Sequence, residues 1–129
     1  MARERILIVE DNPANMLLVS EILQAEGYEV IQAATGQEGL KLASAEKLGL
    51  ILLDIQLPGM DGLAVLAELK ANPLTQQIPV VALTAYARPE DVKQGQEAGF
   101  SGYITKPIGT RGFRELIRGI LAKEKEHGP

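Results

Sequence analysis

Strand-length apolar runs alternate with helix-like segments along this chain, and this alternation limits the folds that it can adopt. The apolar runs cover Arg5–Glu10, Tyr28–Ala33, Gly49–Asp54, Ile78–Thr84 and Gly102–Thr105. The segments with helical spacing, or with glycine and proline at their ends, cover Pro13–Glu26, Gly36–Ala45, Gly62–Ala71, Pro89–Ala98 and Thr110–Lys123. Right-handed crossovers join parallel strands, so this order predicts an α/β fold with a five-stranded parallel sheet.

Length and apolar content are sufficient for one compact domain. The chain has 129 residues, of which 46% are hydrophobic, and this suits a single core. The near-continuous apolar run at Gly49–Asp54 predicts a strand that is buried on both faces, and therefore helices on both sides of the sheet. We expect a doubly wound (βα)5 domain of the flavodoxin-like class over residues 1–123, followed by a charged tail over residues 124–129.

Charge and cysteine content exclude several classes of function. The 13 basic and 17 acidic residues give a net charge of -4, which argues against binding to nucleic acid or to anionic membranes. Cysteine is absent, so disulfides and thiolate metal sites are excluded. The N-terminus does not have the pattern of a signal peptide, and no apolar run reaches membrane-spanning length. We therefore expect a cytoplasmic protein without membrane insertion.

Residues whose side chains can bind metal ions or take part in catalysis lie at the ends of four of the apolar runs. Glu10 ends the first run and Asp11 follows it, Asp54 ends the third, Thr84 ends the fourth and Lys106 follows the fifth. The carboxyl ends of parallel strands share one edge of a sheet, so these side chains are expected to converge. Two carboxylates about 4 Å apart repel by roughly 4 kcal/mol, which favours a bound cation such as Mg2+. The pattern predicts a phosphoryl-transfer site with Asp54 as the nucleophile.

Four stretches of the sequence resemble the motifs of response-regulator receiver domains. They are Ile8–Asn12, Leu52–Gly62, Val80–Ala85 and Tyr103–Pro107, and the resemblance extends over essentially the whole chain. In finer detail the chain is similar to single-domain regulators of the DivK type and to receivers of hybrid histidine kinases. The resemblance implies a single-domain response regulator, a signalling protein rather than an enzyme, although one that assists its own phosphorylation and dephosphorylation.

The resemblance also implies a role for each residue of the metal and phosphate site. Asp54 would accept a phosphoryl group from a histidine kinase or a histidine phosphotransfer protein. Asp11, Asp54 and the backbone carbonyl of Gln56 would ligate Mg2+ or Mn2+, and Glu10 would act through water. Lys106 would pair with the phosphoryl group.

Further residues take switching and tuning roles by the same resemblance. Thr84 would hydrogen-bond a phosphoryl oxygen, and Tyr103 would rotate from an exposed to a buried position. A downstream protein would bind the face made by the fourth helix, fifth strand and fifth helix. Pro107 would follow a cis peptide bond, and Gln56 and Tyr86 would set the lifetime of the phosphorylated state. We expect slower dephosphorylation than in a Tyr86→Ala variant.

Three other functions are compatible with parts of the pattern. A receiver-fold module could bind its partners without phosphorylation. A haloacid-dehalogenase-type phosphatase would require an Asp two residues after the nucleophile, where Gln56 stands. A flavin-binding protein of the same layer architecture would require a glycine-rich loop after Glu10 and a pair of aromatic residues for the flavin ring, and this sequence has neither. Metal-dependent phosphate acceptance separates the first of these from a phosphorylated receiver.

Two local features of the sequence have structural interpretations. Asp61 is expected to cap the third helix, because it directly precedes Gly62. Leu17, Val19 and Leu23 give the first helix more apolar surface than one buried face requires. This surplus indicates either a broad packing stripe or a surface that binds a partner.

Overall fold

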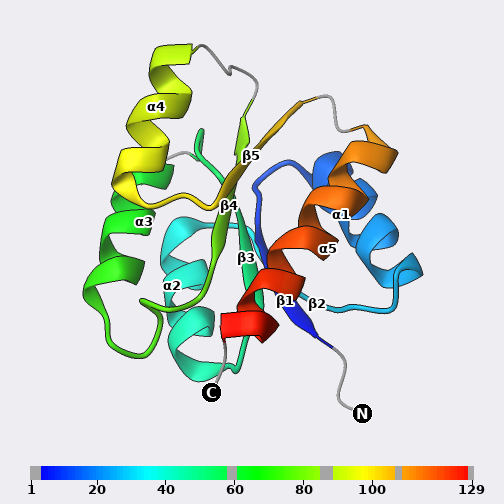
Figure 1. The fold of residues 1–129 in the computed structure, drawn as a ribbon, viewed down its shortest axis with the longest axis horizontal. Helices are drawn as coiled ribbons and strands as arrows, with labels where there is room; N and C mark the ends of the chain where they lie inside the picture. Colours follow the sequence, from blue (N-terminus) through cyan, green and yellow to red (C-terminus); the bar gives the residue numbers. More distant parts are fainter. Residues whose placement is uncertain (1–3, 58–60, 85–88, 107–108, 128–129) are drawn as a thin grey trace.

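The computed structural model describes residues 4–57, 61–84, 89–106 and 109–127 (Figure 1). The strands are β1 (Arg5–Val9), β2 (Glu29–Ala33), β3 (Leu50–Asp54), β4 (Val80–Thr84) and β5 (Gly102–Thr105). The helices are α1 (Pro13–Ala25), α2 (Gly36–Ala45), α3 (Gly62–Ala71), α4 (Pro89–Ala98) and α5 (Thr110–His127). The predicted alternation of strands and helices is confirmed.

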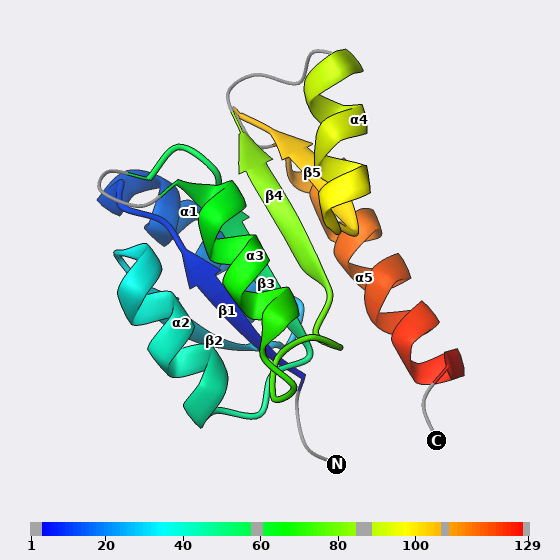
Figure 2. The same cartoon turned by 90° about the vertical axis from the view of Figure 1, so that its left-hand side faces the viewer.

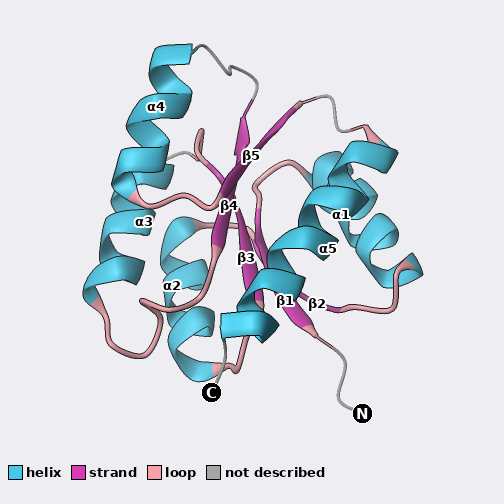
Figure 3. Ribbon diagram, in the orientation of Figure 1, coloured by secondary structure: helices cyan, strands magenta, loops and turns pink. Residues whose placement is uncertain are grey.

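The strands form one parallel sheet in the order β2-β1-β3-β4-β5 (Figure 3). Helices α1 and α5 lie on one side of this sheet, and α2, α3 and α4 lie on the other (Figures 1 and 2). The predicted doubly wound fold is therefore confirmed. β3 lies at the centre of the sheet, so Asp54 at its end has neighbouring strands on both sides.

Successive residues of the inner strands point into two separate apolar cores. In β3, Leu50 and Leu52 pack in the core beneath α1 and α5, whereas Ile51 and Leu53 pack in the core beneath α2 and α3. All four of these side chains are completely buried. Because side chains alternate across a strand, a continuous apolar run is what a strand covered on both faces requires.

Side-chain caps fix where several helices begin. The Asp61 carboxylate accepts a hydrogen bond from the Ala64 N–H at 2.9 Å, which confirms the predicted cap of α3. Thr35 caps α2 by accepting from the Glu38 N–H, and the Glu38 carboxylate accepts in return from the Ala34 N–H. Such caps satisfy N–H groups that the helix itself leaves without a partner.

The element boundaries differ from the prediction in a few places. α5 continues to His127 rather than ending at Lys123, because Glu124, Lys125 and Glu126 are good helix formers and no glycine or proline intervenes. The strands β1 to β4 are one or two residues shorter than predicted. Pro79 lies just before β4, where its carbonyl accepts a hydrogen bond from the Ile51 N–H.

The apolar surplus on α1 divides between two environments. Val19 and Leu23 are completely buried in the core, whereas Leu17 is 60% exposed. The packing interpretation therefore holds for the first two residues and not for Leu17. Across the described parts of the chain, no helix is both long and apolar enough to cross a membrane.

Candidate functional site

The carboxyl ends of four neighbouring strands bring the predicted site residues to one edge of the sheet. The Glu10 N–H donates to the Ala33 carbonyl of β2, which extends the pairing beyond β1. Asp54 ends β3 and pairs in register with Leu83, the residue before Thr84. The Lys106 N–H donates to the Thr84 carbonyl at 2.8 Å, so that the lysine backbone is tied to the end of β4.

The Lys106 ammonium lies between two buried carboxylates. Its Nζ is 2.9 Å from Asp54 Oδ2 and 3.0 Å from Glu10 Oε1. The Glu10 side chain has no exposed surface and that of Asp54 is 3% exposed, whereas the Lys106 side chain is 18% exposed. Buried charges need partners, and Lys106 supplies the positive charge for both carboxylates.

The backbone holds the other oxygen of Asp54. The Gln56 N–H donates to Asp54 Oδ1 at 2.8 Å, while Lys106 donates to Oδ2. The backbone next to Asp54 is held in turn by the Ile55 N–H, which donates to the Leu83 carbonyl, and by the Gly62 N–H, which donates to the Ile55 carbonyl. Each carboxylate oxygen therefore has a donor, and the orientation of Asp54 is fixed before any ligand arrives.

The pKa values of the two buried carboxyl groups shift in opposite directions. Burial, together with the adjacent Asp54, raises the pKa of Glu10 to about 7, against the lowering effect of Lys106 and Asn15. Burial alone would raise the pKa of Asp54, but hydrogen bonds with Glu10, Lys106 and the Gln56 N–H outweigh it and lower that pKa. Asp54 is thus the carboxylate that keeps its negative charge.

The three acidic side chains offer oxygen atoms to one point. Glu10, Asp11 and Asp54 each have a carboxylate oxygen within 4.8 Å of the others. Asp11 is exposed to solvent, so the cluster is open on its side. Carboxylate oxygens with room for retained water are the donors that a hard divalent cation such as Mg2+ prefers, and the described residues therefore fit such an ion.

A comparison with protein families identifies the family of this chain. The family model for the response regulator receiver domain matches residues 6–118. The chain belongs to this family. Receiver domains act in two-component signalling, where they interact with histidine kinases and phosphotransfer proteins. The predicted family resemblance is confirmed.

Individual proteins support the same assignment for this receiver domain. It is 42% identical over 116 residues to the polar-differentiation response regulator DivK of Brucella anthropi, covering 90% of this chain and 94% of the relative. A CheY-like receiver domain protein from Methanospirillum hungatei matches with a TM-score of 0.90 and 36% identity, covering 98% of this chain and 100% of that one.

A second solved structure carries a metal ion. It is the receiver domain of a sensor histidine kinase from Pseudomonas aeruginosa, in which a magnesium ion is coordinated in the active site cleft. It matches this receiver domain with a TM-score of 0.86 and 30% identity, covering 94% of this chain and 99% of that one.

The remaining predicted residues fall into three groups in this receiver domain. Thr84 is buried at the end of β4, and Tyr103 is half-buried on β5. Gln56 has an exposed side chain and contributes its N–H to the site. Pro107 and Tyr86, with the predicted cis peptide and lifetime roles, lie outside the described residues.

Two contacts of the receiver site were not predicted from the sequence. Asn15 hydrogen-bonds Glu10 and opposes the rise in the pKa of that residue. The Gln56 N–H on Asp54 belongs to the backbone, and the side-chain types in a sequence do not report it. The position of Asn15 in the first turn of α1, just after the acidic pair, was the available signal for the first contact. Asn12 itself caps α1 by accepting from the Asn15 N–H.

Proposed function

We propose that Asp54 accepts a phosphoryl group from a phosphohistidine of a histidine kinase or a histidine phosphotransfer protein. The observation that carries this proposal is the shared contact of Lys106 with Glu10 and Asp54 at the end of the central strand. The contact keeps Asp54 ionised, buried and oriented, which is the state that a carboxylate nucleophile requires.

In the proposed reaction, an Asp54 carboxylate oxygen forms a bond to phosphorus while the bond from phosphorus to the histidine nitrogen breaks. The imidazole leaves with the electron pair of that bond, and Asp54 becomes an acyl phosphate. The Lys106 ammonium, which pairs with Asp54 Oδ2 in the structure, is close enough to turn to a phosphoryl oxygen and stabilise its charge. Thr84 ends the neighbouring strand and would donate its hydroxyl to another phosphoryl oxygen.

The acidic cluster is the proposed metal site. Asp11 and Asp54 would hold Mg2+ or Mn2+ directly, together with the Gln56 backbone carbonyl, and Glu10 would act through water. The convergence of the three carboxylates supports this assignment. A bound Mg2+ supplies positive charge that offsets the carboxylates and the phosphoryl oxygens.

Signalling would follow from a change at Thr84 and Tyr103. Drawing Thr84 toward the phosphoryl group would open space for Tyr103, which is half-buried in the structure. Tyr103 lies on β5 next to α4, and the surface of α4, β5 and α5 would be the face that a downstream protein binds. The phosphoryl group thus biases a two-state element, and the partner binds one of the two states.

Incorporation of phosphate from acetyl phosphate tests the proposed function. We expect a gain of one phosphoryl group in intact mass when Mg2+ is present, and no gain in Asp54→Ala. Asp61→Ala is the matched control, because it removes an exposed aspartate that caps α3 and does not belong to the site. No gain in the folded wild-type protein would contradict the proposal and favour a module that binds partners without phosphorylation.

The pKa of Glu10 predicts how Mg2+ affinity depends on pH. Carboxylates that hold a metal ion, directly or through water, bind it in their deprotonated form, and the pKa of Glu10 is about 7. The affinity should therefore rise as the pH increases through this value, by about tenfold between about pH 6 and about pH 8 for one released proton. Calorimetric titration measures both the affinity and the proton release. In Glu10→Gln the affinity should be nearly independent of pH over this range, and an equally steep dependence in that variant would contradict the assignment.

A further inference from the structure

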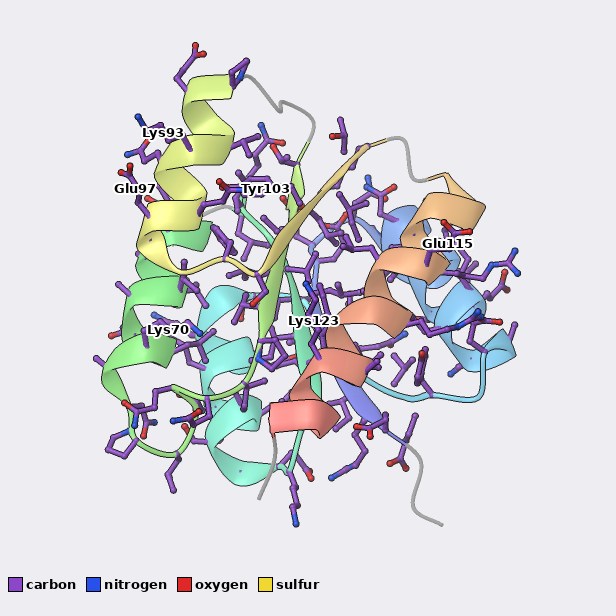
Figure 4. All side chains as sticks on the ribbon, in the orientation of Figure 1. Lys70, Lys93, Glu97, Tyr103, Glu115 and Lys123 are labelled. Atoms are coloured by element: carbon purple, nitrogen blue, oxygen red, sulfur yellow. The ribbon has the colours of Figure 1, made fainter. Side chains whose placement is uncertain are left out.

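The Tyr103 side chain lies between β5 and α4 (Figure 4). It packs against the core on the α2, α3 and α4 side of the sheet, whereas its neighbour Ile104 faces the opposite core. The rings of Tyr103 and Phe100 meet edge to face, with their centroids 5.6 Å apart and an angle of 68° between the ring planes. Such aromatic pairs have preferred geometries, so Phe100 holds one side of the tyrosine ring.

Gly95 in α4 provides the surface on which the other end of this ring rests. A methyl group built on Gly95 would overlap the Tyr103 hydroxyl and the ring carbon that carries it, and would lie 3.0 Å from Tyr103 Cε2. Gly95 is buried. The phenol therefore occupies the space that any side chain at residue 95 would take, and we call this space the glycine slot.

The backbone of Gly95 also ties the slot to Phe100. The Gly95 carbonyl accepts hydrogen bonds from the N–H groups of Gly99 and Phe100, each at 3.0 Å. Gly99 has a φ of +119°, a left-handed conformation that commonly ends a helix at glycine. The last turn of α4, the Phe100 ring and the Tyr103 ring are therefore one connected unit.

Glycine within a helix weakens that helix relative to alanine, so alanine should stabilise a helix wherever its methyl group meets no other atom. Gly119 in α5 is such a position, because a methyl group built on it would meet no other atom within 4 Å. Gly95 differs because the Tyr103 phenol fills the position of its missing side chain.

We propose that Gly95 is a positioning residue that acts through Tyr103. Its lack of a side chain creates the slot that holds the phenol, and so the position of Tyr103 and the packing of α4 depend on each other. When Tyr103 leaves the slot, α4 loses the ring that covers Gly95 and must repack against the sheet. This inference rests on the proposed function, in which Tyr103 moves after phosphorylation, and it names Gly95 as the residue that sets the position from which the ring moves.

A double-mutant cycle on the unphosphorylated protein tests the slot. Gly119→Ala, the matched control, should lower the unfolding equilibrium constant about two- to fivefold, both in the wild-type background and in the Tyr103→Ala background. Gly95→Ala should lower the unfolding equilibrium constant by a similar factor only in the Tyr103→Ala background. With Tyr103 present, Gly95→Ala should raise the constant or leave it unchanged, so that the effect of the substitution differs between the two backgrounds by at least about twofold.

A spectroscopic measurement separates a role in positioning from a merely structural one. In the wild type and in Gly119→Ala, nuclear Overhauser contacts between the Phe100 and Tyr103 rings should be present, as their 5.6 Å separation requires. In Gly95→Ala they should be lost or strongly reduced, because the ring is displaced. If Gly95→Ala does not fold but the double variant does, that result also supports the slot.

The proposal would be overturned if Gly95→Ala and Gly119→Ala stabilised the protein equally in both backgrounds and the ring contacts stayed intact. Phosphate incorporation by the wild type is measured separately, so a failure of the proposed function is distinguishable from a failure of the slot. Asp54 and its donors do not include Gly95, and Gly95→Ala should therefore still gain one phosphoryl group from acetyl phosphate.

Discussion

Lys106→Met should destabilise the metal-free protein by about 2–3 kcal/mol at about pH 8. Removing one partner of a buried ion pair typically costs about 3–5 kcal/mol, and Lys106 is 18% exposed, so a somewhat smaller loss is expected. The physical reason is that Glu10 and Asp54 stay buried without the cation that they share. Methionine keeps the length and most of the apolar contacts of the lysine side chain.

The loss should be smaller at acidic pH. The pKa of Glu10 in the folded protein, about 7, is above its ordinary value of 4.5. The folded state thus holds a proton that the unfolded state has released, and stability falls as the pH rises between these values. Lys106 lowers the pKa of Glu10. In Lys106→Met this pKa should therefore be higher, and the stability should continue to fall up to a higher pH. Below about pH 6, protonated Glu10 no longer repels Asp54, and the remaining loss is that of the Asp54 pair.

Urea unfolding followed by circular dichroism, in the presence of a chelator, measures this loss at both pH values. Lys123→Met is the matched control, because Lys123 is exposed on α5 (Figure 4) and its replacement should change the stability by less than about 0.5 kcal/mol. Added Mg2+ should restore part of the stability of Lys106→Met, since it binds only the folded site. A loss that is equal in the two variants, or independent of pH, would contradict the proposed electrostatic balance.

Leu23→Ala should destabilise the protein by about 3–5 kcal/mol, whereas Leu17→Ala in the same helix should change its stability by less than about 0.5 kcal/mol. Leu23 is completely buried among the side chains beneath α1 and α5, and Leu17 is 60% exposed. The two substitutions remove the same atoms from the same helix, so the difference between them measures burial alone.

Chemical denaturation of both leucine variants checks this prediction. The loss expected for Leu23→Ala is a large fraction of the roughly 5–15 kcal/mol that stabilises an ordinary domain. An equally large loss from Leu17→Ala would mean that the exposed side of α1 is covered in solution. If a second copy of the chain covers this side of α1, the unfolding midpoint would also depend on protein concentration.

The alternation of apolar runs and helical segments was enough to predict the element order and the two-sided burial of β3. Periodicity reports which faces of a segment avoid water, and this is a local property. The site was also predictable in part, because Glu10, Asp54 and Lys106 lie at the ends of their apolar runs and the carboxyl ends of parallel strands share one edge. The family motifs added the expected role of each residue.

Only the tertiary structure decided how these segments meet. The order β2-β1-β3-β4-β5 places Asp54 at the centre of the sheet, and no single segment carries that information. The Gln56 N–H on Asp54 depends on the path of a loop, and the burial of Leu23 rather than Leu17 depends on how α1 turns toward the sheet. Likewise, the sequence predicts that Gly95 lies in a helix, and only the structure shows that the Tyr103 ring packs against it. These contacts depend on how the elements pack against one another, whereas sequence periodicity describes each element alone.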